Sequence, residues 1–235
     1  MIFFKKLALN TEQHNKPIIA SSFVETEKND LQKYFKNGVD IAEIRIDKFS
    51  SFEQEYVLNA LDSFIDVPTI ATIRSPKEDE NSDWNKSESE RLKLFEKVIE
   101  KVDAVDIEYR AGIVCEVISE VRKNHKTSIV SFHNFEETPS FVFLDEVVVK
   151  AKSLGADIVK IATQVNNDND LKTLTKLLLE HKNLIVIGMG EKGVISRIAF
   201  PFLGSLLTFA YAGKSTASGQ LNYQETLKIF QKIVV

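Results

Sequence analysis

The chain has 235 residues, of which 43% are hydrophobic, and it carries a formal net charge of −4. This composition supplies a sizeable core and gives no sign of a nucleic-acid partner or of binding to an acidic membrane surface. We recognise no signal peptide at the N-terminus, and no stretch approaches the roughly 18 uninterrupted apolar residues of a membrane-spanning helix.

Short apolar runs typical of strands alternate along the chain with longer amphipathic segments typical of helices. The predicted strands are 17–23, 40–46, 68–74, 104–109, 127–133, 157–162, 183–189 and 205–211. The predicted helices are 26–37, 52–62, 87–101, 112–124, 140–154, 168–181, 193–202 and 222–233. Strict alternation at this spacing predicts parallel strands joined by helical crossovers.

Eight such repeats predict that the sheet closes into a (β/α)8 TIM barrel, a fold that typically needs about 200 to 250 residues. An open, doubly wound sheet is the alternative architecture for this order of elements. No linker or low-complexity tract divides the sequence. We therefore expect residues 1–235 to form a single catalytic domain.

Cys115 is the sole cysteine, so the chain cannot form an internal disulfide. A protein without disulfides is typical of the cytoplasm. Cys115 lies in the helical pattern GIVCEVISEV (112–121), where we expect a small core residue. A nucleophilic role is the weaker alternative, because no histidine pattern accompanies this cysteine.

Charged and polar residues recur near the C-terminal ends of the predicted strands, where barrel enzymes have their active sites. They are Glu43, Arg45, Arg74, Asp106, Glu108, His133 and Lys160 on the strands, and Arg197 and Gln220 in the segments after the last two strands. Burying unpaired charge is costly, so this ring predicts a functional site. A network of ion pairs that satisfies only itself is the alternative interpretation.

Lys160 stands in the apolar strand ADIVKIA (156–162). Burial and nearby arginines both disfavour its charged form, so we expect a lowered pKa and an amine able to attack a ketone. The alternatives are a lysine that reaches solvent from the strand end, or one paired with Asp106 or Glu108. His133 ends the preceding strand and supplies a group that titrates near neutral pH and can move protons.

The segment GMGEKG (188–193) matches the spacing of a dinucleotide-binding loop, G-x-G-x-x-G. Such a loop usually opens the first strand–helix unit and is followed by an acidic residue at the end of the next strand. Here it belongs to the seventh unit, and the next strand ends in Phe209-Ala210-Tyr211. We therefore expect no nicotinamide cofactor. No spacing of His, Cys and Asp indicates a metal site.

Together these motifs resemble the type I 3-dehydroquinate dehydratases over nearly the whole chain. The motifs are EIRID (43–47), TIR (72–74), VDIE (105–108), SFHNFEETP (131–139), ADIVKIA (156–162), MGEKGVISRI (189–198), GSLLTFA (204–210) and ASGQL (217–221). The resemblance implies a lyase of the shikimate pathway in aromatic amino acid biosynthesis. It also implies a homodimer that needs neither a cofactor nor a metal.

The resemblance implies that Lys160 forms an imine with the ketone of 3-dehydroquinate, while His133 acts as general acid and base. Arg197 matches the family's carboxylate-binding arginine, for which a bidentate fork is well suited. The remaining matches are Glu43, Arg45 and Arg74 around the ring hydroxyls, Thr216 and Gln220 in a closing loop, Ser21 at the end of the first strand, Glu78 near the histidine, Asp106 in support, and Met189 and Phe209 along the pocket.

Two loops depart from the family pattern. The family usually has two glycines after the acid at Glu78, where this chain has Asp79-Glu80. The closing loop has Ser218 where the family has proline, which predicts a less pre-ordered loop. A class I aldolase shares the barrel and the lysine, and is the other enzymatic reading. A catalytically inactive barrel kept as a binding protein is the alternative outside enzymes.

Overall fold

The fold was analysed in a computed structural model that describes residues 16–213 and 219–233. Within these residues eight strands alternate with eight α-helices. The strands are β1 (Ile19–Phe23), β2 (Ile41–Arg45), β3 (Thr69–Thr72), β4 (Ala104–Glu108), β5 (Thr127–Asn134), β6 (Ile158–Gln164), β7 (Leu184–Met189) and β8 (Thr208–Phe209). The helices are α2 (Lys28–Lys36), α3 (Gln54–Leu61), α4 (Glu88–Val98), α5 (Val114–Lys123), α6 (Phe141–Ser153), α7 (Asp168–Glu180), α8 (Val194–Leu203) and α9 (Tyr223–Ile233). The predicted elements are confirmed, with boundaries that differ by a few residues.

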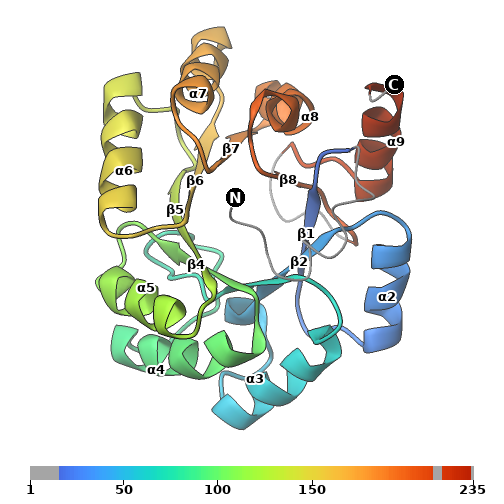
Figure 1. The fold of residues 1–235 in the computed structure, drawn as a ribbon, viewed down its shortest axis with the longest axis vertical. Coiled ribbons are helices and arrows are strands. Elements are labelled where there is room, and N and C mark those ends of the chain that lie inside the picture. The colour runs from blue at the N-terminus through green and yellow to red at the C-terminus, as the bar shows by residue number, and fades with distance from the viewer. Residues whose placement is uncertain (1–15, 214–218, 234–235) are drawn as a thin grey trace.

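The strands pair in parallel in the order β7-β6-β5-β4-β3-β2-β1-β8. The ring is completed by a parallel bridge between Leu184 of β7 and Ser205, just before β8. Figure 1 shows the helices arranged around the outside of this ring. The predicted (β/α)8 barrel is therefore confirmed, and the open sheet is excluded.

The last strand is shorter than the predicted segment 205–211. The Ser205 hydroxyl accepts a hydrogen bond from the backbone N–H of Val186 at 3.1 Å and donates to the Leu207 carbonyl at 3.1 Å. This side chain therefore takes a place in the ladder that backbone groups fill between the other strands. Strands β7 and β8 are therefore joined by the bridge at Leu184 and by the hydrogen bond from Val186 to the Ser205 side chain.

Apolar side chains form two separate layers, as alternation along the strands requires. One cluster fills the barrel interior and includes Ala20, Ile41, Ile129, Ile158 and Ala162. The larger cluster lies between the strands and the helices. Because the interior cluster occupies the body of the barrel, the polar strand ends lie above a packed floor.

Cys115 differs from the sequence expectation, because its side chain is exposed on α5. Helix α5 turns Val114, Val117, Ile118 and Val121 toward the barrel, and Cys115 falls outside this buried face. No helix within the described residues is long and apolar enough to cross a membrane.

Candidate active site

Lys160 extends from β6 into the barrel and is only 5% exposed. Its Nζ lies 3.0 Å from Asp106 Oδ2 and 3.5 Å from Glu43 Oε1, and it sits over the Phe209 ring at 4.5 Å from the centroid. Its stem lies between the interior residues Ile158 and Ala162, as predicted. The end of the side chain is paired with Asp106, which is the alternative that the sequence analysis left open.

Asp106 on β4 forms ion pairs with both Lys160 and Arg74. Its Oδ1 accepts hydrogen bonds from Arg74 Nη2 at 2.9 Å and from the Ser131 hydroxyl at 2.6 Å. Burial alone would raise the pKa of Asp106, but Arg74 and Lys160 outweigh burial and hold that pKa far below its ordinary value. The carboxylate is therefore ionised at any physiological pH.

Glu43 on β2 is held from two sides. The Ser22 hydroxyl donates to its Oε2 at 2.5 Å, and the Thr72 hydroxyl donates to its Oε1 at 3.1 Å. Burial opposes ionisation, yet Lys160 and then Arg45 lower the pKa of Glu43 below its ordinary value. Glu43 thus presents a fixed negative charge beside the lysine.

His133 at the end of β5 is paired with Glu78. One Glu78 oxygen lies 2.9 Å from the His133 backbone nitrogen and 3.3 Å from Nδ1, and Phe135 stacks on the imidazole at a centroid distance of 6.0 Å. Burial and the positive charge of Arg74 lower the pKa of His133, while Glu78 opposes them. Burial would raise the pKa of Glu78, but its hydrogen bond with His133 lowers it. The imidazole is therefore neutral near pH 7, with Nδ1 oriented.

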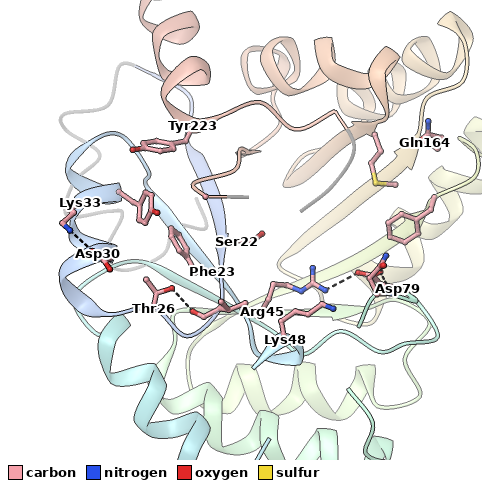
Figure 2. A pocket seen from close by; sticks show the side chains of 16 residues that line it. Ser22, Phe23, Thr26, Asp30, Lys33, Arg45, Lys48, Asp79, Gln164 and Tyr223 are labelled. Atoms are coloured by element: carbon pink, nitrogen blue, oxygen red, sulfur yellow. Dashed lines mark hydrogen bonds and ion pairs between the residues drawn. The ribbon is translucent and has the colours of Figure 1, made fainter. Parts of the chain in front are cut away.

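The altered loop after Glu78 contacts Arg45 at the end of β2. Arg45 forms a fork with Asp47, at 3.0 Å from Nε and 2.8 Å from Nη2, and reaches Asp79 at 3.3 Å. Figure 2 shows the guanidinium of Arg45 directed at Asp79 on the cavity wall. Asp79, at a position where the resemblance led us to expect glycine, therefore adds a carboxylate to the rim without displacing Glu78.

Arg197 projects from α8 and is 3% exposed. Its Nη1 donates to the Phe209 carbonyl at 3.2 Å, and burial lowers the pKa of Arg197 to about 10. The guanidinium still carries its charge at neutral pH. It places a cation on the opposite side of the barrel mouth from Arg74, since it arises from α8 rather than β3.

These groups surround an inner cavity of about 80 Å³. The predicted site residues that line it are Glu43, Arg45, Arg74, His133, Lys160, Met189, Arg197, Phe209 and Gln220. An outer cavity of about 1150 Å³ shares Ser22, Arg45, Asp79, Phe135 and Met189 with it (Figure 2). A small molecule can therefore reach the lysine and the histidine through the mouth of the barrel.

Three predicted site residues, Ser21, Glu78 and Asp106, do not line this cavity, and a fourth lies outside the described residues. Ser21 is fully buried and donates to the Ala210 carbonyl at 2.8 Å, so its side chain faces away from the site. Its neighbour Ser22 lines the cavity instead, since β1 turns Ala20 and Ser22 inward. Alternation from Ala20 could have identified this serine. Asp106 acts from behind Lys160, and Thr216 lies outside the described residues, as does Ser218.

Sequence reasoning also missed Ser131, Asp47 and Arg91, which hold Arg74, Arg45 and Glu108 respectively. Ser131 shares the inward face of β5 with His133, so strand alternation carried a signal for it. Arg91 is on α4, and no local pattern indicated that it reaches a strand-end carboxylate.

The glycines of GMGEKG serve packing between β7 and α8. Gly190 has a φ of +78°, and a Cβ on Gly193 would lie 2.4 Å from the Gly188 carbonyl carbon. The strand and the helix that follows it therefore approach too closely for side chains, which explains the motif without a dinucleotide.

Comparison with known proteins gives matches across nearly the whole chain. The model of the family described as type I 3-dehydroquinase matches residues 17–234. The 3-dehydroquinate dehydratase of Thermodesulfovibrio yellowstonii is 34% identical over 220 residues, covering 92% of this chain and 96% of that protein. The structure of the 3-dehydroquinate dehydratase from Aquifex aeolicus has a TM-score of 0.82 at 32% identity, covering 92% and 98%. The type I enzyme of Clostridium difficile, solved with covalently modified comenic acid, has a TM-score of 0.83 at 27% identity, covering 94% of each chain.

Proposed function

This chain belongs to the type I 3-dehydroquinase family of lyases, and we propose that it converts 3-dehydroquinate to 3-dehydroshikimate and water through an imine on Lys160. The observation that carries the proposal is that Lys160, His133 and the buried guanidinium of Arg197 line one small cavity. This set supplies a nucleophilic amine, a neutral base and a cation for a carboxylate. Such an activity belongs to the shikimate pathway.

In this mechanism Arg197 binds the substrate carboxylate, and Glu43 and Asp106 hold Nζ of Lys160 at the cavity wall. After the ammonium loses a proton, the amine attacks the ring ketone, and loss of water gives a protonated imine. The positive imine nitrogen withdraws electrons from the adjacent carbon and acidifies its C–H bond. The protonated imine thus acts as an electron sink without a cofactor.

His133 then moves the proton. Its Nδ1–H donates to Glu78, so the Nε2 lone pair is free to remove the proton from the carbon beside the imine. The electrons form an enamine, which expels the ring hydroxyl on the next carbon as water, with the proton returned by His133. Hydrolysis of the conjugated imine releases the enone and restores Lys160. Atoms balance as substrate giving product and one water.

The test is to follow enone absorbance after adding 3-dehydroquinate to the purified protein. Wild type is expected to turn over, Lys160→Ala to be inactive, and His133→Ala to be slower by a factor of about 10² to 10⁴, the usual contribution of a general acid–base. Lys176→Ala, on the exposed side of α7, is the matched control and should retain full activity. A wild-type protein that produces no enone would refute the proposal.

We also propose that the protein is a homodimer formed through the outer face of α8. Ile195, Phe202 and Leu203 lie on one side of this helix and are 57%, 41% and 43% exposed. An apolar stripe of this kind is typical of an interface. Light scattering should give a dimer for wild type and a monomer for Phe202→Lys, whereas a monomeric wild type contradicts the proposal.

Two further proposals concern the chain as a whole. Residues 1–235 act as one catalytic domain, because the described residues belong to one barrel and the family model spans 17–234. The protein works in the cytoplasm, because its one cysteine is an exposed thiol with no internal partner, which suits a reducing compartment. Fractionation of cells that express it would test the location.

A further inference from the structure

A line of buried charges with alternating sign runs from helix α4 to the lysine of the site. Arg91 Nη1 lies 2.9 Å from Glu108 Oε2, and Glu108 Oε1 lies 3.8 Å from Arg74 Nη1. Arg74 Nη2 is 2.9 Å from Asp106 Oδ1, whose other oxygen is 3.0 Å from Lys160. The five residues are all at most 5% exposed. Each charge is therefore held between opposite charges with little solvent screening.

Arg91 begins this line from outside the barrel. Helix α4 lies in the outer ring (Figure 1), yet the Arg91 side chain is completely buried and its Nη1 also donates to the Ile73 carbonyl at 2.9 Å. Within the described part of the chain, its Nε has no hydrogen-bond partner. Buried ion pairs are often no more stabilising than apolar residues of similar size. Packing alone therefore does not explain an arginine at this position.

Glu108 and Asp106 are two carboxylates that compete for Arg74. Arg91 Nη1 contacts both oxygens of Glu108, at 3.0 and 2.9 Å, and the Ser75 backbone N–H donates to one of them. With Glu108 engaged in this way, Arg74 keeps its short contacts for Asp106 and Ser131. Arg74 accordingly lies 3.8 Å from Glu108 but only 2.9 Å from Asp106.

We propose that Arg91 is a positioning residue for the reaction, which neutralises Glu108 so that Arg74 stays directed at Asp106 beside the catalytic lysine. The proposal rests on the proposed function, because it assigns Arg74 and Asp106 to the ordering of that site. Arg91 touches neither the cavity nor the reacting atoms. It acts through Glu108 and Arg74.

The consequence can be measured at His133. The charged groups that face this imidazole are Arg74, Glu78, Lys160 and Asp106. Without Arg91, Glu108 draws Arg74 toward itself, so a positive charge moves away from His133 and Asp106 is less neutralised. Both changes favour the imidazolium, and the pKa of His133 rises.

The test compares Arg91→Gln with Lys97→Gln, which removes the same charge from an exposed position on the same helix. Titration of ¹³C-labelled His133 by NMR, without substrate, should give a higher pKa for Arg91→Gln and the wild-type value for Lys97→Gln. With 3-dehydroquinate, kcat at neutral pH should fall by about 2- to 30-fold, the range expected for coupling through a contiguous network. The acidic limb of the pH–rate profile should move to higher pH.

A second variant separates positioning from packing. Glu108→Gln, combined with Arg91→Gln, removes the carboxylate that would capture Arg74, so the titration of His133 and kcat should return toward wild type. If Arg91 serves only packing, the double variant will be no better than the single one, and the proposal is overturned. If Arg91→Gln is too unstable to study, Arg91→Lys should shift the titration in the same direction by less, because an ammonium lacks the fork.

An unchanged His133 titration in both Arg91 variants also overturns the proposal. The titration needs no substrate, so it decides the role of Arg91 even if the wild-type protein fails to dehydrate 3-dehydroquinate. In that case the proposed function fails and the positioning of Arg74 is judged separately.

Discussion

Asp106→Asn is the substitution whose cost follows most directly from the structure. It removes a charge that lies 2.9 Å from Arg74 and 3.0 Å from Lys160. At an effective dielectric constant of about 20, each pair has a gross attraction of roughly 5 to 6 kcal/mol, most of which offsets the desolvation of the charges. Removing one partner from such a buried group typically costs about 3 to 5 kcal/mol, because the other charges stay buried.

The free energy of unfolding should therefore fall by about 3 to 5 kcal/mol in guanidinium denaturation. For a chain of this length the melting temperature should fall by roughly 6 to 20 °C, at about 2 to 4 °C per kcal/mol. Asp79→Asn is the matched control, because its carboxylate makes one 3.3 Å ion pair with Arg45 at the rim. Its cost should stay below about 1 kcal/mol.

The loss of stability in Asp106→Asn should depend on pH. The pKa of Asp106 is lowered in the folded state, so its stabilisation is present above the unfolded pKa of about 3.9 and is lost as pH falls toward the folded value. The difference between wild type and Asp106→Asn should be constant near neutral pH and shrink below about pH 4. A cost under about 1 kcal/mol at neutral pH would refute the view that Asp106 holds the two cations.

Three other predictions follow from the site and from the core. Glu78 opposes the lowering of the His133 pKa, which already lies below the ordinary histidine value of about 6.5. Glu78→Gln should therefore shift the acidic limb of the kcat/KM profile to still lower pH, and a shift to higher pH would contradict this. Arg197→Lys should raise KM for 3-dehydroquinate by roughly 10- to 150-fold, because a hydrogen bond to a charged group contributes about 1.5 to 3 kcal/mol; steady-state kinetics with an unchanged KM would exclude carboxylate binding by Arg197. Leu174→Ala, at a fully buried position of α7, should cost about 2 to 5 kcal/mol in denaturant unfolding while turnover per folded molecule is kept, and a smaller cost would mean that α7 packs loosely.

The fold could be predicted because its signals are local. Apolar runs such as 183–189 and amphipathic runs such as 168–181 repeat often enough to count, and eight such repeats favour a closed barrel over an open parallel sheet. The sequence expectation was wrong for Cys115 because the helix has a richer apolar face on its other side. The eighth strand was overestimated because the Ser205 side chain replaces ladder contacts that a pattern does not reveal.

The site was predictable in its residues and less so in its contacts. His133 and Lys160 stand out as polar groups at the ends of apolar strands, and the cavity does bring them together. Ser21 was matched through the family resemblance alone, whereas alternation from Ala20 indicates Ser22 on the inward face of the strand. The ion pair of Lys160 with Asp106 was one of the alternatives that the sequence left open, whereas the contact with Glu43, 117 residues away along the chain, is revealed only by the tertiary structure.

The most direct test of the central assignment is to trap the imine. Wild-type protein would be incubated with 3-dehydroquinate and borohydride, and its intact mass and peptide map recorded, with Lys160→Ala treated in parallel. The account predicts a stable adduct on the peptide that carries Lys160, and its absence from the variant. An adduct on another lysine, or turnover of 3-dehydroquinate by Lys160→Ala, would contradict the assignment.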